Sequence, residues 1–288
     1  MDDRHNRLRE LLDAPEIAVL PGCYDALSAK IVEKAGFDAV YLSGAGVSNT
    51  KLGLADLGLT TLTEMVERVG EVAGAVSVPV VSDADTGYGN PLHVRRTVEL
   101  YERAGASALH LEDQSFPKKC GHFDDKRLVP ADELIRKVEA AVDARHDSGF
   151  TIIARTDARA VEGIDAAIER SNAYADAGAD LIFPEAPQSK EEMARFCDEI
   201  DAPVMANMVE DGKTPLLSAD ELGEIGYDLV IFPNSLLRGA MTTMVELAGH
   251  LRETGSTLDV EDRIANFELR NDLTDYERLR ELEARYSN

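Results

Sequence analysis

Two aspartates and a glutamate follow neighbouring apolar segments of the chain and have the chemistry of ligands for a hard cation. Asp83 and Asp85 are two residues apart, so on the extended end of a strand their carboxylates would project to the same side. Glu112 ends the next apolar segment, and carboxylates that converge on one face repel one another unless a cation lies between them. An oxygen-only cluster of this kind suits Mg²⁺, with Mn²⁺ as the second candidate. The competing interpretation is a pair of turn-forming aspartates before the glycine-rich residues 86–89.

A cysteine among cations forms the second reactive group, in the run Lys118-Lys119-Cys120-Gly121-His122. Lysine and histidine beside a cysteine stabilise its thiolate and lower the pKa of the thiol toward the working range. Gly121 permits the sharp bend or the movement that a loop over a site requires. The alternatives are a solvated basic loop and a fragment of a Cys-x-His metal site. The second lacks further soft ligands nearby.

Short β-branched segments, each followed by a helical pattern, must position these side chains. The eight predicted strands are Ile17–Pro21, Asp38–Ser43, Pro79–Asp83, Ser107–Glu112, Phe150–Arg155, Asp180–Pro184, Pro203–Asn207 and Asp228–Pro233. Amphipathic segments such as Leu92–Ala104, Ala131–Ala144 and Ile164–Ala177 lie between them, and a glycine often ends the helix, as at Gly105 and Gly178. Eight such units predict a closed (β/α)₈ barrel, because a parallel sheet needs helices on its outer face. Neither GxGxxG after the first strand nor GxxxxGK[ST] occurs, which disfavours a nucleotide-binding open sheet.

Polar residues stand at nearly every predicted strand end, where barrel enzymes carry their active sites. These ends are residues 41–46, 83–89, 110–113 and 155–157, together with Glu185 and Asn207. Each alone is explained by turns or helix caps. All of them together favour one reactive site at the C-terminal end of the barrel.

Composition restricts the partners of the chain. It carries 54 acidic and 30 basic residues in 288, a formal net charge of −24. Such a field repels nucleic acid and anionic lipid, so we expect neither as a partner. The acidity also suggests adaptation to a salt-rich cytoplasm, where screening weakens self-repulsion. The three cysteines, Cys23, Cys120 and Cys197, are odd in number, far apart and without CxxC spacing, so we expect neither a disulfide framework nor a structural zinc site.

Charge and hydropathy along the chain predict its organisation. No apolar run is long enough to cross a membrane, and the charged first ten residues do not resemble a signal peptide, so we expect a cytoplasmic protein. No linker or low-complexity segment interrupts the pattern. We therefore predict one domain over residues 1–288, with a charged helical tail over about 260–288 that packs on the barrel or on a neighbouring subunit.

Three motifs together carry a family resemblance: Pro21–Ala26, Asp83–Gly89 and Lys118–His122. Their combination resembles the isocitrate lyase/phosphoenolpyruvate mutase superfamily, over about Pro21 to Leu237, and is most similar to the short, methylisocitrate-lyase-type members. The cysteine motif favours these lyases over the phosphonomutase and oxaloacetate-decarboxylase branches. The resemblance implies Mg²⁺-dependent cleavage of a carbon–carbon bond in a 2-hydroxy tricarboxylate, with a 2-oxo acid and succinate as products. It also implies a homotetramer that exchanges C-terminal helices between subunits.

The resemblance also assigns roles in catalysis. It implies that Asp85 is the direct metal ligand, with Asp83 and Glu112 acting directly or through water. Cys120 becomes the acid that protonates the carbanion. The residues that adjust its proton affinity are His122, Lys118 and Glu185.

Substrate contacts follow from the same resemblance. Arg155 pairs with a substrate carboxylate, and Asn207 contacts the carboxylate of the leaving half. The remaining substrate-contacting positions are Tyr41, Ser43, Gly44, Gly46, Asp56 and Gly121.

One departure affects the expected substrate. After Asn207 the lyases offer a hydroxyl to a carboxylate, whereas this chain has Met208-Val209, with Thr214 or Ser218 as substitutes. A less polar pocket keeps 2,3-dimethylmalate open beside 2-methylisocitrate and isocitrate. A phosphonomutase, phosphonopyruvate hydrolase or oxaloacetate decarboxylase is the alternative enzyme class, and a non-catalytic barrel is the alternative outside enzymes.

Overall fold

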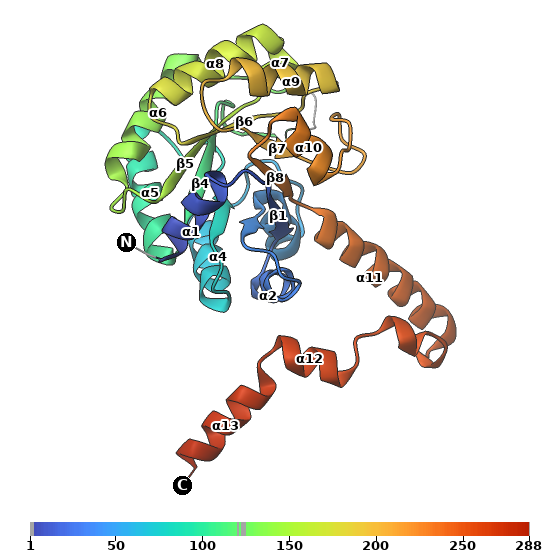
Figure 1. Ribbon diagram of the computed structural model, residues 1–288. Coiled ribbons are helices and arrows are strands. Elements are labelled where there is room, and N and C mark those ends of the chain that lie inside the picture. Colours follow the sequence, from blue (N-terminus) through green and yellow to red (C-terminus); the bar gives the residue numbers. More distant parts are fainter. Residues whose placement is uncertain (1–2, 120, 122–124, 288) are drawn as a thin grey trace. The chain divides into compact units, whose positions relative to one another are not determined.

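The computed structural model describes residues 3–119, 121 and 125–287. The chain divides into two compact units, Met1–Leu236 and Leu237–Asn288. The first unit contains the strands and the helices between them (Figure 1). The second consists of helices alone.

Eight parallel strands form the barrel of the first unit, as predicted (Figure 1). They are β1 (Ala18–Cys23), β2 (Val40–Leu42), β3 (Val80–Asp83), β4 (Ala108–Glu112), β5 (Thr151–Thr156), β6 (Leu181–Pro184), β7 (Met205–Asn207) and β8 (Leu229–Phe232). Their order is β6-β5-β4-β3-β2-β1-β8-β7. A parallel bridge between Ile182 and Val204 joins the β6 end to the β7 end, so the sheet closes.

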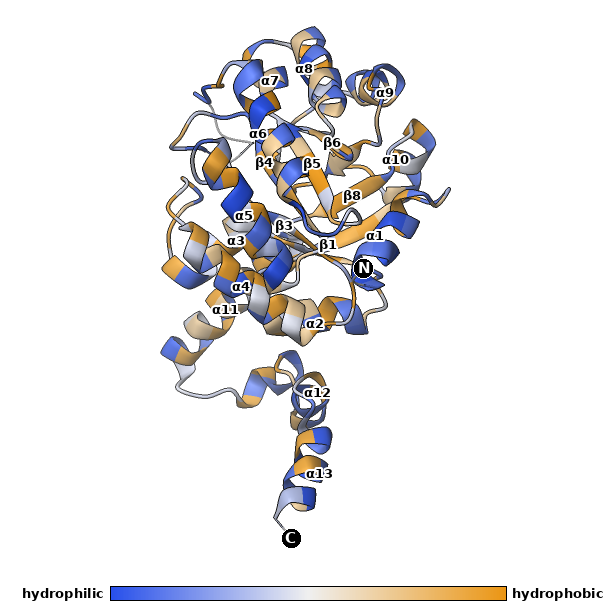
Figure 2. Cartoon of the chain, turned by 90° about the vertical axis from the view of Figure 1, so that its left-hand side faces the viewer, coloured by the Kyte–Doolittle hydropathy of each residue, from blue (hydrophilic) through white to orange (hydrophobic). Residues whose placement is uncertain are grey.

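Alternation along the strands divides the apolar core into two layers. One buried cluster takes one face of the strands and fills the barrel, with Leu20, Tyr41, Val81, Ile153 and Phe183 among its members. The larger cluster lies between the other face and the helices. Figure 2 shows the strands as hydrophobic ribbons beneath amphipathic helices. Burial on both faces explains why the strands read as continuous apolar runs.

The helices that surround the barrel begin and end where local sequence predicts. They are α2 (Ala26–Lys34), α4 (Leu62–Ala75), α5 (Pro91–Ala104), α6 (Ala131–Ala144), α8 (Ile164–Asp176), α9 (Lys190–Glu199) and α10 (Ala219–Ile225), with the short α3 (Gly44–Val47) and α7 (Ala158–Val161) near strand ends. Gly105 follows α5 with φ of 100°, a left-handed conformation that only glycine adopts without strain. Three helices begin with a capping box, at Asp25, Thr61 and Ser218.

Helix α1 (Asp3–Leu12) closes the barrel at the end opposite the polar strand termini. Its Leu8 packs into the barrel interior. Arg4 donates to the carbonyl of Ala73, His5 bonds the carbonyl of Ala106, and Arg9 donates to the carbonyl of Gly149. The helix therefore ties together the segments that lead into β3, β4 and β5.

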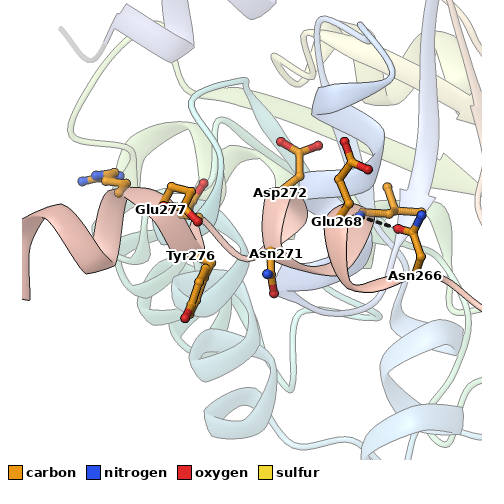
Figure 3. A pocket seen from close by; sticks show the side chains of 9 residues that line it. Asn266, Glu268, Asn271, Asp272, Tyr276 and Glu277 are labelled. Carbon is orange, nitrogen blue, oxygen red and sulfur yellow. Dashed lines mark hydrogen bonds between the residues drawn. The ribbon is translucent and has the colours of Figure 1, made fainter.

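The second unit contains most of α11 (Ser235–Thr254), a 3₁₀ segment (Leu258–Arg263), α12 (Phe267–Leu273) and α13 (Tyr276–Tyr286). Helices α12 and α13 have no buried residue. A hollow of about 860 Å³ between them is lined by carboxylates and by Tyr276 (Figure 3). No helix within residues 3–119 and 125–287 is both long and apolar enough to cross a membrane.

Candidate active site

The polar strand ends converge at the C-terminal end of the barrel. Parallel register sets Asp83 beside His110, Glu112 beside Arg155, and Thr156 beside Pro184, which precedes Glu185. All of these polar side chains are buried. Charged groups are rarely buried without partners, so their contacts define the site.

The two aspartates meet in a turn rather than along an extended strand. β3 ends at Asp83, and Asp85 has φ of 46°. The backbone N–H of Asp85 donates to Asp83 Oδ1 at 2.9 Å. The turn, not strand alternation, therefore brings the carboxylates together, which corrects the geometric reason for expecting them to cluster.

Lys118 pairs with the carboxylates of this cluster. Its Nζ lies 2.5 Å from Asp56 Oδ1 and 2.8 Å from Asp85 Oδ1, and the residue is buried. Burial disfavours the ammonium, but Asp85, Asp83 and Asp56 raise the pKa of Lys118 well above its usual value. Burial, with the charge of Asp83, raises the pKa of Asp85 to about 6, against the opposing effect of Lys118. The structure thus unites Asp56 and Lys118 with the acidic cluster.

Glu112 has acceptor oxygens that fit a hard cation. Both carboxylate oxygens are buried and have no hydrogen-bond partner, and Arg155 Nε is 3.4 Å from Oε2. Burial raises the pKa of Glu112 well above its usual value, despite the nearby Arg155 and Lys118. Within the described part of the chain no three His, Cys, Asp or Glu side chains form a ready-made metal group, and the Lys118 ammonium lies among the carboxylates. The oxygen-only donors and the Glu112 oxygens, which accept no hydrogen bond, nevertheless fit Mg²⁺.

Tyr41 and His110 form a buried pair at the floor of the site. Tyr41 Oη and His110 Nε2 are 2.8 Å apart, and the two rings are stacked with centroids 5.9 Å apart. His110 Nε2 is also 3.5 Å from Asp83 Oδ1. Burial lowers the pKa of His110 to about 4, so the imidazole is neutral near pH 7. His110 had not been given a role from sequence, although it alternates with Glu112 on β4 and therefore shares its face.

Arg155 stands at the centre of a second network. Its guanidinium contacts both oxygens of Asp157, reaches Glu185 Oε2 at 3.3 Å, and lies 4.9 Å above the ring of Phe183. Asn207 donates through Nδ2 to both oxygens of Glu185, at 3.3 and 3.1 Å. Asn207 Oδ1 is buried without a hydrogen-bond partner. The predicted residues of β5, β6 and β7 therefore lie together.

The loop after β2 packs against the acidic cluster. A Cβ at Gly44 would come within 2.5 Å of Asp83 Oδ2, so only glycine fits there. Ser43 accepts from the backbone N–H of Gly46 as the N-cap of α3, and its hydroxyl donates to Asn234 Oδ1 at 3.1 Å. The backbone of α3 therefore begins beside Asp83.

Gly121 belongs to the loop after β4 that carries the cysteine motif in its sequence (called the cysteine loop below), and its backbone lies against Arg155 and Glu185. A Cβ at Gly121 would be 2.4 Å from Arg155 Nη2 and 2.6 Å from Glu185 Cδ. The described loop backbone is therefore in contact with both side chains. The predicted catalytic residues Cys120 and His122 lie outside the described residues.

Thr214 and Ser218 are the candidates to replace the hydroxyl that the lyases carry after Asn207, and the two residues differ in their surroundings. Ser218 caps α10 by accepting from Glu221 N, so its side chain is engaged there. Thr214 is buried, and its Oγ1 has no hydrogen-bond partner. Met208 is buried, and its sulfur accepts from Leu217 N. The segment after Asn207 thus contains a buried apolar residue, Met208, and one buried hydroxyl without a hydrogen-bond partner, that of Thr214.

Fold and site together define a class of protein: a parallel barrel with buried carboxylates, a buried lysine and a buried arginine at its C-terminal strand ends is an enzyme scaffold. Residues 8–252 match the sequence profile of the phosphoenolpyruvate phosphomutase family, and the chain belongs to this family, within the isocitrate lyase/phosphoenolpyruvate mutase superfamily.

Relatives include named lyases. The chain is 46% identical to the 2,3-dimethylmalate lyase of Eubacterium barkeri, over 98% of this chain and 97% of the relative. It is 49% identical to probable 2-methylisocitrate lyase 2 of Corynebacterium glutamicum, over 91% and 85%. An oxaloacetate acetylhydrolase structure with 3,3-difluorooxalacetate superposes with a TM-score of 0.94, at 35% identity, over 99% of this chain and 97% of that one.

Proposed function

We propose that the chain is a Mg²⁺-dependent carbon–carbon lyase that cleaves a 2-hydroxy tricarboxylate such as 2-methylisocitrate to pyruvate and succinate. One observation carries the proposal: the backbone of Gly121 contacts Arg155 and Glu185. Gly121 follows Cys120 directly in the sequence, so this contact supports a role for the cysteine beside the side chains best suited to bind and orient a carboxylate. Relatives named 2-methylisocitrate lyase, at 40–49% identity, support it.

The proposed cleavage is a retro-aldol reaction. The hydroxyl proton passes to a base or to water, the bond between the hydroxyl-bearing carbon and its carboxylate-bearing neighbour breaks, and a carbonyl forms on the pyruvate half. The electron pair remains on the succinate half, where the adjacent carboxylate delocalises it. Cys120 gives its thiol proton to that carbon, and His122, Lys118 and Glu185 adjust the proton affinity of the thiol.

Arg155 would orient the leaving half. Its planar guanidinium is anchored by Asp157 and Glu185, so a substrate carboxylate meets a cation of fixed orientation. Asn207 Oδ1 and Nδ2 lie on the same side of the site, beside Glu185. This arrangement supports the roles proposed for Arg155 and Asn207.

The pyruvate half would bind at the β2 and β3 ends. Tyr41, Ser43, Gly44, Gly46 and Asp56 are proposed to contact it. Among these, Gly44 packs on Asp83 and Asp56 pairs with Lys118. The residues that would bind Mg²⁺ are Asp83, Asp85 and Glu112. The ion when bound supplies Lewis acidity at the substrate oxygens.

A second candidate substrate is 2,3-dimethylmalate, which would give pyruvate and propionate by the same bond cleavage. Buried Met208 beside Asn207 favours it, because a methyl group there avoids leaving a carboxylate without a partner. The 46% identity to a 2,3-dimethylmalate lyase over nearly the whole chain also favours it.

Exchange of Cys120 for serine tests the reaction class. A lyase that needs a thiol acid should lose activity by about three orders of magnitude, since a serine hydroxyl is a far weaker acid. A decarboxylase or phosphonomutase should keep activity within a few-fold. Cys197→Ser is the matched control, because Cys197 lies on α9 against Gly226, away from the strand ends. Activity unaffected by Cys120→Ser would reject the lyase mechanism.

We also propose a cytoplasmic homotetramer in which C-terminal helices are exchanged between subunits. Large exposed apolar residues on α12 and α13, such as Phe267 and Leu279, support a second copy as their partner. Neither nucleic acid nor membrane is proposed to bind, given the net charge of −24.

The same charge supports stability in concentrated salt. Loss of secondary structure below ~1 M KCl, where screening weakens, is the expected result. Equal stability in dilute buffer would refute adaptation to salt.

A further inference from the structure

Lys126 is a buried cation for which neither the sequence analysis nor the proposed reaction has a use. It lies in the segment between β4 and α6, in the same loop as Gly121. Its Nζ donates to Asp157 Oδ1 at 2.6 Å and to the backbone carbonyl of Gly121. Its side chain is only 2% exposed. One ammonium therefore connects the end of β5 to the cysteine loop.

Asp157, at the other end of this connection, is held by hydrogen bonds to its backbone and to its carboxylate. Asp157 is fully buried, its backbone N–H donates to Asp113 Oδ1 at 2.9 Å, and its carboxylate accepts from Arg155 Nε at 3.0 Å. Burial alone would raise the pKa of Asp157, but Arg155 and Lys126 hold it well below its usual range. Asp157 is therefore an ionised anchor that binds the substrate-facing arginine and the loop lysine at once.

A cavity and polar contacts border the segment that precedes Gly121. A cavity of about 680 Å³ lies there, lined by residues that include Gln114, Phe116, Lys119 and Lys126. Phe116 is 73% exposed. Gln114 exchanges two hydrogen bonds with the backbone of Lys119, at 2.8 and 3.0 Å. Polar contacts, rather than an apolar core, thus determine where this backbone lies.

We propose that Lys126 is a positioning residue, which fixes the Gly121 backbone against Arg155 and Glu185 by bonding its carbonyl from the Asp157 anchor. The inference rests on the proposed function, because it gives that contact a purpose in catalysis. An ion pair that served stability alone would need only Asp157. The second bond, to a carbonyl in the cysteine loop, couples the pair to the loop.

Lys126→Met tests the proposal through two readouts. The first is kcat against KM: a misplaced loop lowers kcat about 10- to 100-fold, the range expected for one charge-assisted hydrogen bond, and leaves KM within about threefold. The second is native-state trypsin cleavage after Lys119, which should accelerate severalfold while cleavage at other sites does not change. Lys190→Met is the control, because it removes an exposed pair with Glu221 at 2.9 Å.

The outcomes separate the inference from the proposed function. Unchanged kcat and unchanged cleavage after Lys119, or acceleration at all sites equally, would overturn the positioning role. If the wild type lacks lyase activity the proposed function fails, and cleavage after Lys119 still decides whether Lys126 holds the loop. Lys126→Arg keeps a cation beside Asp157, and it replaces Lys126→Met in both measurements if the methionine variant does not fold. It should show the same loop-specific acceleration to a smaller degree.

Discussion

The backbone of Gly121 contacts Arg155 so closely that a Cβ added at Gly121 would lie 2.4 Å from Arg155 Nη2. Thirty-odd residues of chain separate the two, and Lys126 and Asp157 connect them through hydrogen bonds. Arg155 also lies within ion-pair distance of Glu112 and Glu185. The contact with Gly121 therefore connects the loop after β4 to the acidic residues of the site through a single arginine.

Gly121→Ala should therefore displace the loop. The added Cβ must move Arg155 or the loop by about an ångström, and a misplacement of that size costs about 100-fold in kcat/KM. Gly70→Ala is the control, since a Cβ there meets nothing within 4 Å. It should leave activity unchanged and stabilise α4 by about 0.5–1 kcal/mol. Steady-state kinetics and thermal unfolding of both variants check this, and a fully active Gly121→Ala enzyme would contradict the close contact.

Glu112→Gln should separate metal binding from folding. Burial raises the pKa of Glu112 and so disfavours its charged form when no cation is present, and an uncharged amide of the same shape should therefore cost little stability. Mg²⁺ should stabilise the wild type by about 2.7 kcal/mol at 100 times its Kd. It should stabilise the variant far less. Chemical unfolding with and without Mg²⁺ measures both, with the exposed Glu221→Gln as control. Equal stabilisation of wild type and Glu112→Gln would remove Glu112 from the metal site.

His110 should make stability depend on pH. Its pKa is about 4 in the folded protein and near 6.5 when unfolded, so the unfolded state binds more protons between these values. The His110 contribution is therefore fully present above pH 6.5 and is lost as pH falls toward 4. Asp85, with its pKa raised to about 6, acts in the opposite direction over part of this window, so the wild-type curve alone does not isolate His110.

The difference in the free energy of unfolding between the wild type and His110→Gln isolates the His110 contribution. From pH 5 to pH 6.5 the free energy of unfolding of the wild type should rise by about 1.6 kcal/mol relative to the variant. Urea unfolding at several pH values in constant salt gives this slope. A difference that does not change with pH would mean that His110 is not held neutral by burial.

Replacement of Leu279 by glutamate should weaken assembly. Leu279 is 58% exposed on α13, and a partner subunit that covered it would have to bury a charge. Light scattering should give four times the 31.4 kDa chain mass for the wild type and a smaller mass for the variant. Glu281→Ala, on the same helix, is the control. A wild type that scatters as a monomer would refute the tetramer.

Much of the fold follows from local sequence. β4 was predicted over Ser107–Glu112 and is found over Ala108–Glu112, and α6 agrees at both ends. β4 is short and mostly apolar, as expected of a strand buried on both faces, and the preceding helix α5 ends at Gly105 in a left-handed conformation. Because all the strands are parallel, their C-terminal ends lie at the same end of the barrel. Glu112 and Arg155, which end neighbouring strands, could therefore be expected to meet.

Contacts made by the loop after β4 could not be predicted in the same way. Lys118 reaches back 62 residues to Asp56, and Lys126 reaches forward 31 residues to Asp157. A lysine in a polar loop reads as solvent-exposed, and only the tertiary arrangement reveals its burial. Asp85 was expected on an extended strand, but the turn at residues 84–87 gives it a positive φ instead.

The central claim is tested most directly by identifying products from candidate acids. The enzyme, in high salt with Mg²⁺, is offered 2-methylisocitrate, isocitrate, 2,3-dimethylmalate, oxaloacetate and phosphonopyruvate separately. We predict equal amounts of pyruvate and succinate from 2-methylisocitrate, abolished by EDTA and restored by Mg²⁺. Pyruvate and propionate from 2,3-dimethylmalate alone would select the second substrate. Pyruvate from oxaloacetate or phosphonopyruvate alone would contradict the account and remove Cys120 from its catalytic role.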